Sequence, residues 1–135
     1  MLHHVEIYVA DLEESRLFWS GLLEELSYEL YQTWNEGFSY KFADTYLVFV
    51  QTEEPFVAEG YHRKRVGLNH LAFHGGTKER VDDFRAKLKA KGTKLLYEER
   101  YPFAGGENHY AVFFEDPNGI KVKFVQKSQR NVVAF

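Results

Sequence analysis

The chain has 135 residues with 44% hydrophobic and 17% aromatic side chains, which predicts one compact domain or two small halves and excludes intrinsic disorder. Seventeen Lys and Arg against twenty Asp and Glu give a net charge of −3, so we expect no basic surface for nucleic acid or an anionic membrane. The absence of Cys excludes disulfides and Cys-ligated metal sites. Because no membrane-length apolar run and no signal peptide pattern occur, we expect a cytoplasmic protein.

The first half of the sequence predicts a strand, a helix and three further strands. Residues 2–9 alternate between apolar and polar side chains, the period of a strand with one face on a core. Asp11 and Glu14 have the spacing of a capping box, and apolar residues then recur at helical spacing over 12–26. Turn-forming residues separate three short strands, expected at about 28–34, 38–43 and 46–51.

The second half predicts the same order of elements. Residues 68–74 alternate like the first strand, Thr77 can cap the helix that follows, and Gly92 suits the end of that helix. Strands are then expected at about 94–99, 109–115 and 120–126, with a tight Asp-Pro-Asn-Gly turn at 116–119 before the last of them.

The spacing of matched residues indicates an internal repeat. His4 and His70 are 66 positions apart, whereas the Phe-Val-Gln segments that end the two halves are 75 apart. The second copy therefore carries about nine extra residues, which we place in the Gly-Gly loop at 101–108. The expected organisation is a first module at 1–52, a connection at 53–66, a second module at 67–127 and a tail at 128–135.

Three segments of the sequence resemble one protein family. They are the opening HHVEIYVADLEESRLFWSGLL, the second-half NHLAFH and the closing FFEDPNGIKVKFV. In this order and spacing they are similar to the vicinal oxygen chelate superfamily of glyoxalase I, extradiol dioxygenases, fosfomycin-resistance enzymes and bleomycin-resistance proteins. The resemblance covers about residues 2–127 and implies an α+β fold. Two tandem βαβββ modules would form a curled mixed sheet around a cleft, with the helices outside.

The resemblance also implies a divalent metal (Zn, Ni, Mn or Fe) in that cleft, held by one His from each module and one carboxylate. The His positions fall on His4 and His70, but the carboxylate positions fall on Lys123 and Val48. A lysine ammonium has no lone pair and repels a cation, so a metal would need a substitute third ligand. The candidates for that ligand are Glu6, Glu107 and His109.

Three functions remain open on this basis. The first is a metal-dependent lyase, isomerase or dioxygenase acting on a small oxygen-rich substrate. The second is a metal-free protein that sequesters a small molecule, as bleomycin-resistance proteins do. The third is a metal-independent enzyme with Glu6 and Lys123 as acid and base, although these two can also form a purely structural ion pair. The missing carboxylate disfavours ordinary glyoxalase I and typical extradiol dioxygenases.

Further ligand contacts are expected from residues on the inward faces and in the Gly-Gly loop. Tyr8 shares the face of Glu6, and Lys121 shares the face of Lys123, where two lysines would favour an anionic ligand. His109 and Tyr110 follow the glycine pair and are binding-loop candidates. The apolar end of the tail favours a C2 homodimer. The expected partners are thus a small molecule and a second copy of the chain, without nucleic acid or membrane.

Overall fold

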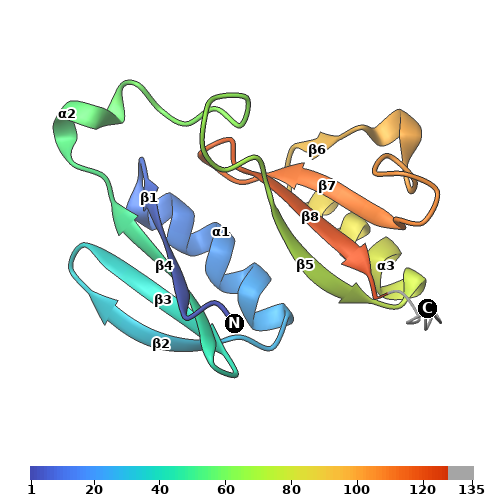
Figure 1. Cartoon of the computed structure of the whole chain (residues 1–135), viewed down its shortest axis with the longest axis horizontal. Coiled ribbons are helices and arrows are strands. Elements are labelled where there is room, and N and C mark those ends of the chain that lie inside the picture. The colour runs from blue at the N-terminus through green and yellow to red at the C-terminus, as the bar shows by residue number, and fades with distance from the viewer. Residues whose placement is uncertain (128–135) are drawn as a thin grey trace. The chain divides into compact units, whose positions relative to one another are not determined.

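The computed structural model describes residues 1–127 and confirms the α+β fold of two βαβββ copies (Figure 1). The first copy contains β1 (His4–Val9), α1 (Leu12–Glu25), β2 (Glu29–Trp34), β3 (Gly37–Phe42) and β4 (Thr45–Gln51). The second contains β5 (Leu71–Gly76), α3 (Lys78–Ala90), β6 (Leu95–Leu96), β7 (Ala111–Glu115) and β8 (Lys121–Gln126). The short helix α2 (Glu54–Val57) lies in the connecting segment between the copies.

Each copy forms its own four-stranded mixed sheet over the described residues. The strand order is β1-β4-β3-β2 in the first sheet and β5-β8-β7-β6 in the second. In both sheets the first strand of the copy pairs in parallel with the last, and the other pairs are antiparallel. In each copy the helix and two strands lie between these paired strands in the sequence, which satisfies the dozen or more residues that a parallel crossover needs.

The chain divides into two compact units, which we call unit 1 and unit 2. Unit 1 comprises residues 1–62 together with 116–119, and unit 2 comprises residues 63–115 and the chain from Ile120 onwards. The boundary between them lies inside the connection expected at 53–66. The turn between β7 and β8 belongs to unit 1, although the strands on either side of it belong to unit 2.

Aromatic stacking and one buried hydrogen bond organise the core of unit 1. Helix α1 begins at the predicted cap, where the Asp11 side chain accepts a hydrogen bond from the backbone N–H of Glu14 at 3.0 Å. The Trp19 ring stacks on Phe49 with 4.9 Å between centroids. Its indole Nε1 donates to Asp116 Oδ2 at 3.0 Å, and both residues are buried. The Asp-Pro-Asn-Gly turn therefore completes this core.

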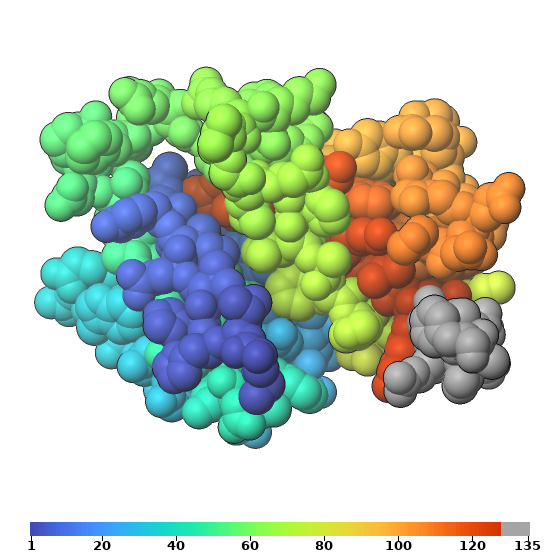
Figure 2. All heavy atoms as spheres, viewed as in Figure 1, coloured from blue at the N-terminus to red at the C-terminus, as the bar shows by residue number. Residues whose placement is uncertain are grey.

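Helix α3 covers one face of the sheet in unit 2. The Thr77 hydroxyl caps the helix by accepting from the backbone N–H of Arg80 at 3.1 Å, and Gly92 follows it with φ +77°, as the sequence predicts. Phe84 packs its ring against Phe124 at 4.2 Å and Phe114 at 6.1 Å between centroids. In Figure 2 the atoms of β8, coloured red, reach the surface between those of β5 and β7.

Two expected elements differ from the structure. The strand expected at 94–99 is only Leu95–Leu96, because Tyr97 adopts a left-handed backbone with φ 56° and ψ 36° and begins a 3₁₀ turn. The strand expected at 68–74 begins at Leu71, so His70 lies just before it. The contact expected from the tail falls at 128–135, outside the described residues. No helix within residues 1–127 has the length and apolarity needed to cross a membrane.

Candidate functional site

The sheet face of unit 2 opposite α3 carries two lysines side by side. Side chains alternate along β8, so Val122 and Phe124 are buried on the helix side while Lys121 and Lys123 lie half-buried on the other. Phe113 is the register partner of Lys123 in the neighbouring strand β7. We call this region the lysine face, defined by His70, Tyr97, His109, Phe113, Lys121 and Lys123.

The ring of Phe113 is the centre of the lysine face. The ammonium nitrogens of Lys121 and Lys123 lie 5.3 Å and 5.4 Å from its centroid, within the range of cation–π attraction. The Tyr97 ring meets Phe113 edge-on at 5.4 Å, and the His70 ring does so at 6.4 Å. Lys121 Nζ also donates a hydrogen bond to the Tyr97 hydroxyl oxygen at 3.2 Å.

The Gly-Gly loop approaches the lysine face through His109 and Gly105. Lys123 Nζ lies 3.4 Å from His109 Nδ1. Because an ammonium can only donate, Nδ1 accepts this bond and the proton of the neutral ring is on Nε2. A Cβ on Gly105 would lie 3.4 Å from Lys123 Nζ and 3.3 Å from Phe113 Cζ, so a glycine keeps the loop close to the lysine without crowding it.

Burial and nearby positive charge change the pKa values of three groups on this face. Burial, assisted by the charges of Lys121 and Lys123, lowers the pKa of His70 and favours its neutral form. Burial and the charge of Lys121 likewise lower the pKa of Lys123. The hydrogen bond from Lys121 lowers the pKa of Tyr97. Burial is thus the larger cause for His70 and Lys123, and positive charge contributes to all three shifts.

The residue opposite Lys121 in the neighbouring strand is acidic and already forms ion pairs with other residues. Glu115 is the register partner of Lys121. One of its carboxylate oxygens accepts from Arg63 at 2.6 Å, and the other lies 3.5 Å from Lys94 Nζ. Within residues 1–127 neither Lys121 nor Lys123 forms an ion pair with a carboxylate.

An Asp on α3 holds both ends of the Gly-Gly loop. Asp82 Oδ1 accepts hydrogen bonds from the hydroxyls of Tyr101 at 2.5 Å and Tyr110 at 2.7 Å. The Arg85 guanidinium lies 4.5 Å from the centroid of the Tyr101 ring. Tyr110, which the sequence suggests as a ligand contact, thus has its hydroxyl bound to the helix, and its contact with a ligand stays a prediction.

The other predicted site residues lie on β1 in unit 1. Glu6 and Tyr8 are exposed and are register partners of Val48 and Val50. His4 stacks its ring on Tyr46 with 4.8 Å between centroids. Since these residues belong to unit 1 and the lysine face to unit 2, a pair formed by Glu6 and Lys123, or by His4 and His70, stays a prediction.

The side chains around His70 do not suit a divalent cation. His70 Nδ1 lies 2.7 Å from Asn69 Oδ1, an acceptor, so Nδ1 carries the proton and Nε2 has the free lone pair. The charges that act on His70 are those of the Lys121 and Lys123 ammonium groups. Lys123 holds the strand position at which the resemblance implies a carboxylate. Within residues 1–127 no three His, Asp or Glu side chains gather to form a metal site in either unit.

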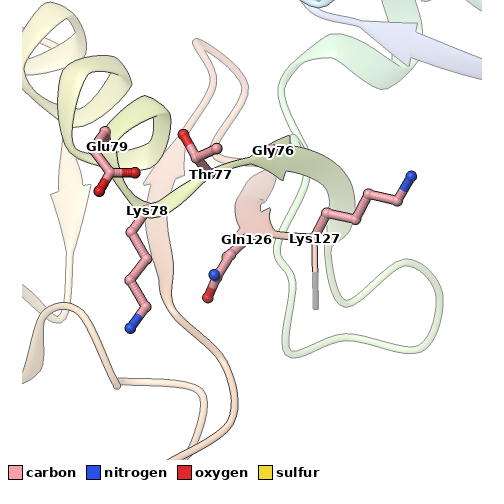
Figure 3. Close-up of a pocket in the computed structure, with 6 residues that line it drawn as sticks. All are labelled: Gly76, Thr77, Lys78, Glu79, Gln126 and Lys127. Atoms are coloured by element: carbon pink, nitrogen blue, oxygen red, sulfur yellow. The ribbon is translucent and has the colours of Figure 1, made fainter. Parts of the chain in front are cut away.

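A separate hollow of about 490 Å³ lies at the N-terminal end of α3 (Figure 3). It is lined by Gly76, Thr77, Lys78, Glu79, Gln126 and Lys127. The two lysine side chains point in different directions in Figure 3 and do not converge on one point. The Thr77 hydroxyl at this hollow already accepts the hydrogen bond that caps the helix.

Two residues of the lysine face, Phe113 and Tyr97, could not be recognised as site residues from the sequence alone. Phe113 is an ordinary strand residue in the sequence, and only the register of β7 against β8 places it beside Lys123. Tyr97 was expected inside a strand, and its left-handed backbone redirects it. Side chains alternate along both strands, so Phe113 can be placed on the same face as Lys123 once the pairing of the two strands is known.

Comparisons with known proteins agree with this fold. The profile of the Glyoxalase/Bleomycin resistance protein/Dioxygenase superfamily matches residues 1–124. Uncharacterized protein YqjT of Bacillus subtilis (strain 168) is 57% identical over 127 residues, which are 94% of this chain and 99% of that protein. A crystal structure of a provisionally assigned glyoxalase from Bacillus halodurans is 62% identical, with a TM-score of 0.92 over 94% of this chain and 96% of that one.

A more distant structure shares the fold alone. Lactoylglutathione lyase from Agrobacterium tumefaciens is 17% identical and superposes with a TM-score of 0.66, covering 93% of this chain and 92% of that one. The family profile spans most of the sequence, and the described secondary structure has the same two βαβββ copies that the resemblance implies. The chain therefore belongs to the glyoxalase/bleomycin resistance protein/dioxygenase superfamily.

Proposed function

We propose that this protein binds a small organic molecule at the lysine face without the help of a divalent metal. The observation that carries the proposal is Lys123, whose ammonium stands where the resemblance implies a metal-binding carboxylate. Lys121 lies beside it on the same ring of Phe113. Among the functions that the sequence leaves open, this arrangement best supports metal-free binding of a small molecule.

Electrostatics support this choice over a metal-dependent lyase, isomerase or dioxygenase. Two ammonium groups on one face repel a divalent cation, and the repulsion grows where water is partly excluded. Both lysines are half-buried, and burial contributes to the lowered pKa of Lys123. Small-molecule sites in proteins combine apolar walls with a few convergent polar groups. Phe113 and Tyr97 supply such walls here, and the lysines supply the polar groups.

The test compares metal binding by untagged wild-type protein and two charge-reversal variants. After incubation with zinc, nickel, manganese or iron(II) and dialysis, we expect wild type to keep well below one equivalent of metal. The Lys123→Glu variant replaces the repelling ammonium by a carboxylate and is expected to gain metal. Lys127→Glu is the matched control, because it makes the same charge change at an exposed residue just after β8.

Elemental analysis of the dialysed proteins separates the outcomes. Near-stoichiometric metal in wild type that is lost in His70→Ala would overturn the proposal and favour the metal-dependent enzyme. Equal metal content in Lys123→Glu and Lys127→Glu would contradict the argument that Lys123 keeps a cation out of this position.

A further inference from the structure

We infer that the lysine face binds the carboxylate or phosphate group of its ligand, held jointly by Lys121, Lys123 and the Tyr97 hydroxyl. This inference rests on the proposed function and adds the chemical class of the ligand to it. The ligand is thus a small organic acid or phosphate ester, and the shared chemistry is an oxyanion with two or three acceptor oxygens.

The two lysines are like charges that are both partly removed from water. Their ammonium groups approach the same aromatic ring at 5.3 Å and 5.4 Å. Within residues 1–127 neither pairs with a carboxylate, and Glu115, the register partner of Lys121, is bound by Arg63 and Lys94. Cations held together in this way repel each other in the ligand-free protein, and a bound oxyanion removes that penalty.

Lys121, Lys123 and Tyr97 all keep hydrogen-bond donors for a bound acceptor. The Tyr97 oxygen accepts from Lys121 at 3.2 Å, which leaves the phenolic O–H to donate to a ligand. Each ammonium carries three N–H groups, so both keep donors for a ligand after their contacts with Tyr97 and His109. Charge-assisted hydrogen bonds to carboxylate or phosphate are the strong ones in proteins.

The backbone of Tyr97 adopts an unusual conformation. A tyrosine in the left-handed region, here at φ 56° and ψ 36°, is uncommon and costs conformational energy. This backbone ends β6 and brings the phenol beside Lys121 and the ring of Phe113. The burial of Phe113 beneath the lysines means that the ligand meets the charged groups first.

The test measures binding of three probes of similar shape by isothermal titration calorimetry: benzoate, phenyl phosphate and the neutral benzamide. We expect wild type to bind at least one of the two anions and to bind benzamide at least about tenfold more weakly. Binding of benzoate alone, or of phenyl phosphate alone, tells which oxyanion the site prefers. Rising salt concentration should weaken the anion binding.

Three variants assign the binding to named groups. Lys121→Gln and Lys123→Gln should each weaken anion binding about tenfold or more, and Tyr97→Phe about threefold to tenfold. Lys127→Gln is the matched control and should leave the affinity unchanged, because this exposed residue lies outside the lysine face. Thermal unfolding adds a readout without a ligand: Lys121→Gln should raise the melting temperature, because it removes the repulsion between the two cations.

The inference is overturned if wild type binds neither anion more tightly than benzamide, or if Lys127→Gln weakens binding as much as Lys121→Gln. It is also overturned if Lys121→Gln lowers the melting temperature and leaves anion affinity unchanged. These results differ from a failure of the proposed function, which would appear as His70-dependent metal binding in the elemental analysis.

Discussion

Trp19 and Asp116 show at the scale of single residues how a distant part of the sequence completes a core. Their side chains hydrogen-bond at 3.0 Å although they are 97 positions apart, and both are buried. Asp116 also accepts from the backbone and side-chain nitrogens of Asn118, each at 2.8 Å. A buried carboxylate needs such partners, because an unsatisfied buried charge is strongly destabilising.

We therefore predict that Trp19→Phe lowers the free energy of unfolding by about 2–4 kcal/mol, since it removes the N–H donor and leaves a small cavity. Urea unfolding followed by circular dichroism measures this change. Leu17→Ala on the same helix is the control, because Leu17 is 82% exposed and its truncation should cost within about 0.5 kcal/mol. Equal costs for the two variants would contradict a stabilising role for this hydrogen bond.

Several single residues could be assigned correctly from the sequence. Asp11 and Thr77 cap their helices, and Gly92 ends α3 in the left-handed region. These assignments succeed because a cap depends on backbone groups only two or three positions away. Phe113 and Tyr97 could not be assigned to the site in this way, because their neighbours come from another strand.

At the scale of elements, helix α3 and the Gly-Gly loop are joined by one carboxylate. Two tyrosine hydroxyls donate to Asp82, which lowers the pKa of Asp82 from its usual 3.8. Burial and the bond to Asp82 raise the pKa of Tyr101, and the bond to Asp82 followed by burial raises that of Tyr110. The arrangement thus requires an ionised Asp82 together with two neutral tyrosines.

The signs of these shifts define a pH window. Asp82 contributes to the stability of the fold at pH values above 3.8, its pKa in the unfolded chain. This contribution is lost as the pH falls through the lower pKa of the folded protein. Tyr101 and Tyr110 contribute to the stability of the fold at pH values below 10.0, their pKa in the unfolded chain. This contribution is lost as the pH rises through their raised pKa values in the folded protein. The interaction therefore stabilises the fold between these two limits.

We predict that Asp82→Asn destabilises the protein by less than about 1 kcal/mol, because the group is exposed and screened by water. The difference from wild type should be constant near neutral pH and should shrink at both ends of the window. Urea midpoints measured over a pH series test this. Asp83→Asn, the adjacent exposed residue of α3, is the matched control. A difference that does not change with pH would rule out this account.

The order of elements follows from local sequence, whereas their ends depend partly on tertiary contacts. Helices α1 and α3 and most of the strands lie within a few residues of their expected positions, whereas the short helix α2 was not expected. The exception is β6, expected over six residues and present as Leu95–Leu96. The left-handed backbone of Tyr97, whose hydroxyl accepts a hydrogen bond from Lys121, ends this strand.

At the scale of the whole molecule, the segment 116–119 is part of unit 1 but is joined on both sides to strands of unit 2, β7 and β8. Asn118 Oδ1 accepts from the backbone N–H of Ala10 at 2.9 Å, in addition to the bond between Trp19 and Asp116. Unfolding of β7 and β8 would therefore withdraw a buried part of unit 1.

We predict that Phe84→Ala, in the core of unit 2, also lowers the stability of unit 1. Truncation of this buried ring should cost about 3–5 kcal/mol. Trp19 and Trp34 are the two tryptophans of the chain, and both lie in unit 1, so tryptophan fluorescence reports on that unit. The fluorescence midpoint in urea should fall together with the circular dichroism midpoint. An unchanged fluorescence midpoint would show that the units unfold independently.

The sequence by itself determined the repeat, the α+β class, the helix caps and the family, because these depend on periodicity and on neighbours along the chain. It also placed Lys121 and Lys123 on one face of the last strand, since alternation is a local property. Only the tertiary structure decided what surrounds them. Strand register brings Phe113 beneath the lysines, Arg63 and Lys94 bind Glu115, and a left-handed residue brings Tyr97 to Lys121. Such contacts join residues far apart in sequence, and their geometry exists only once the sheet has formed.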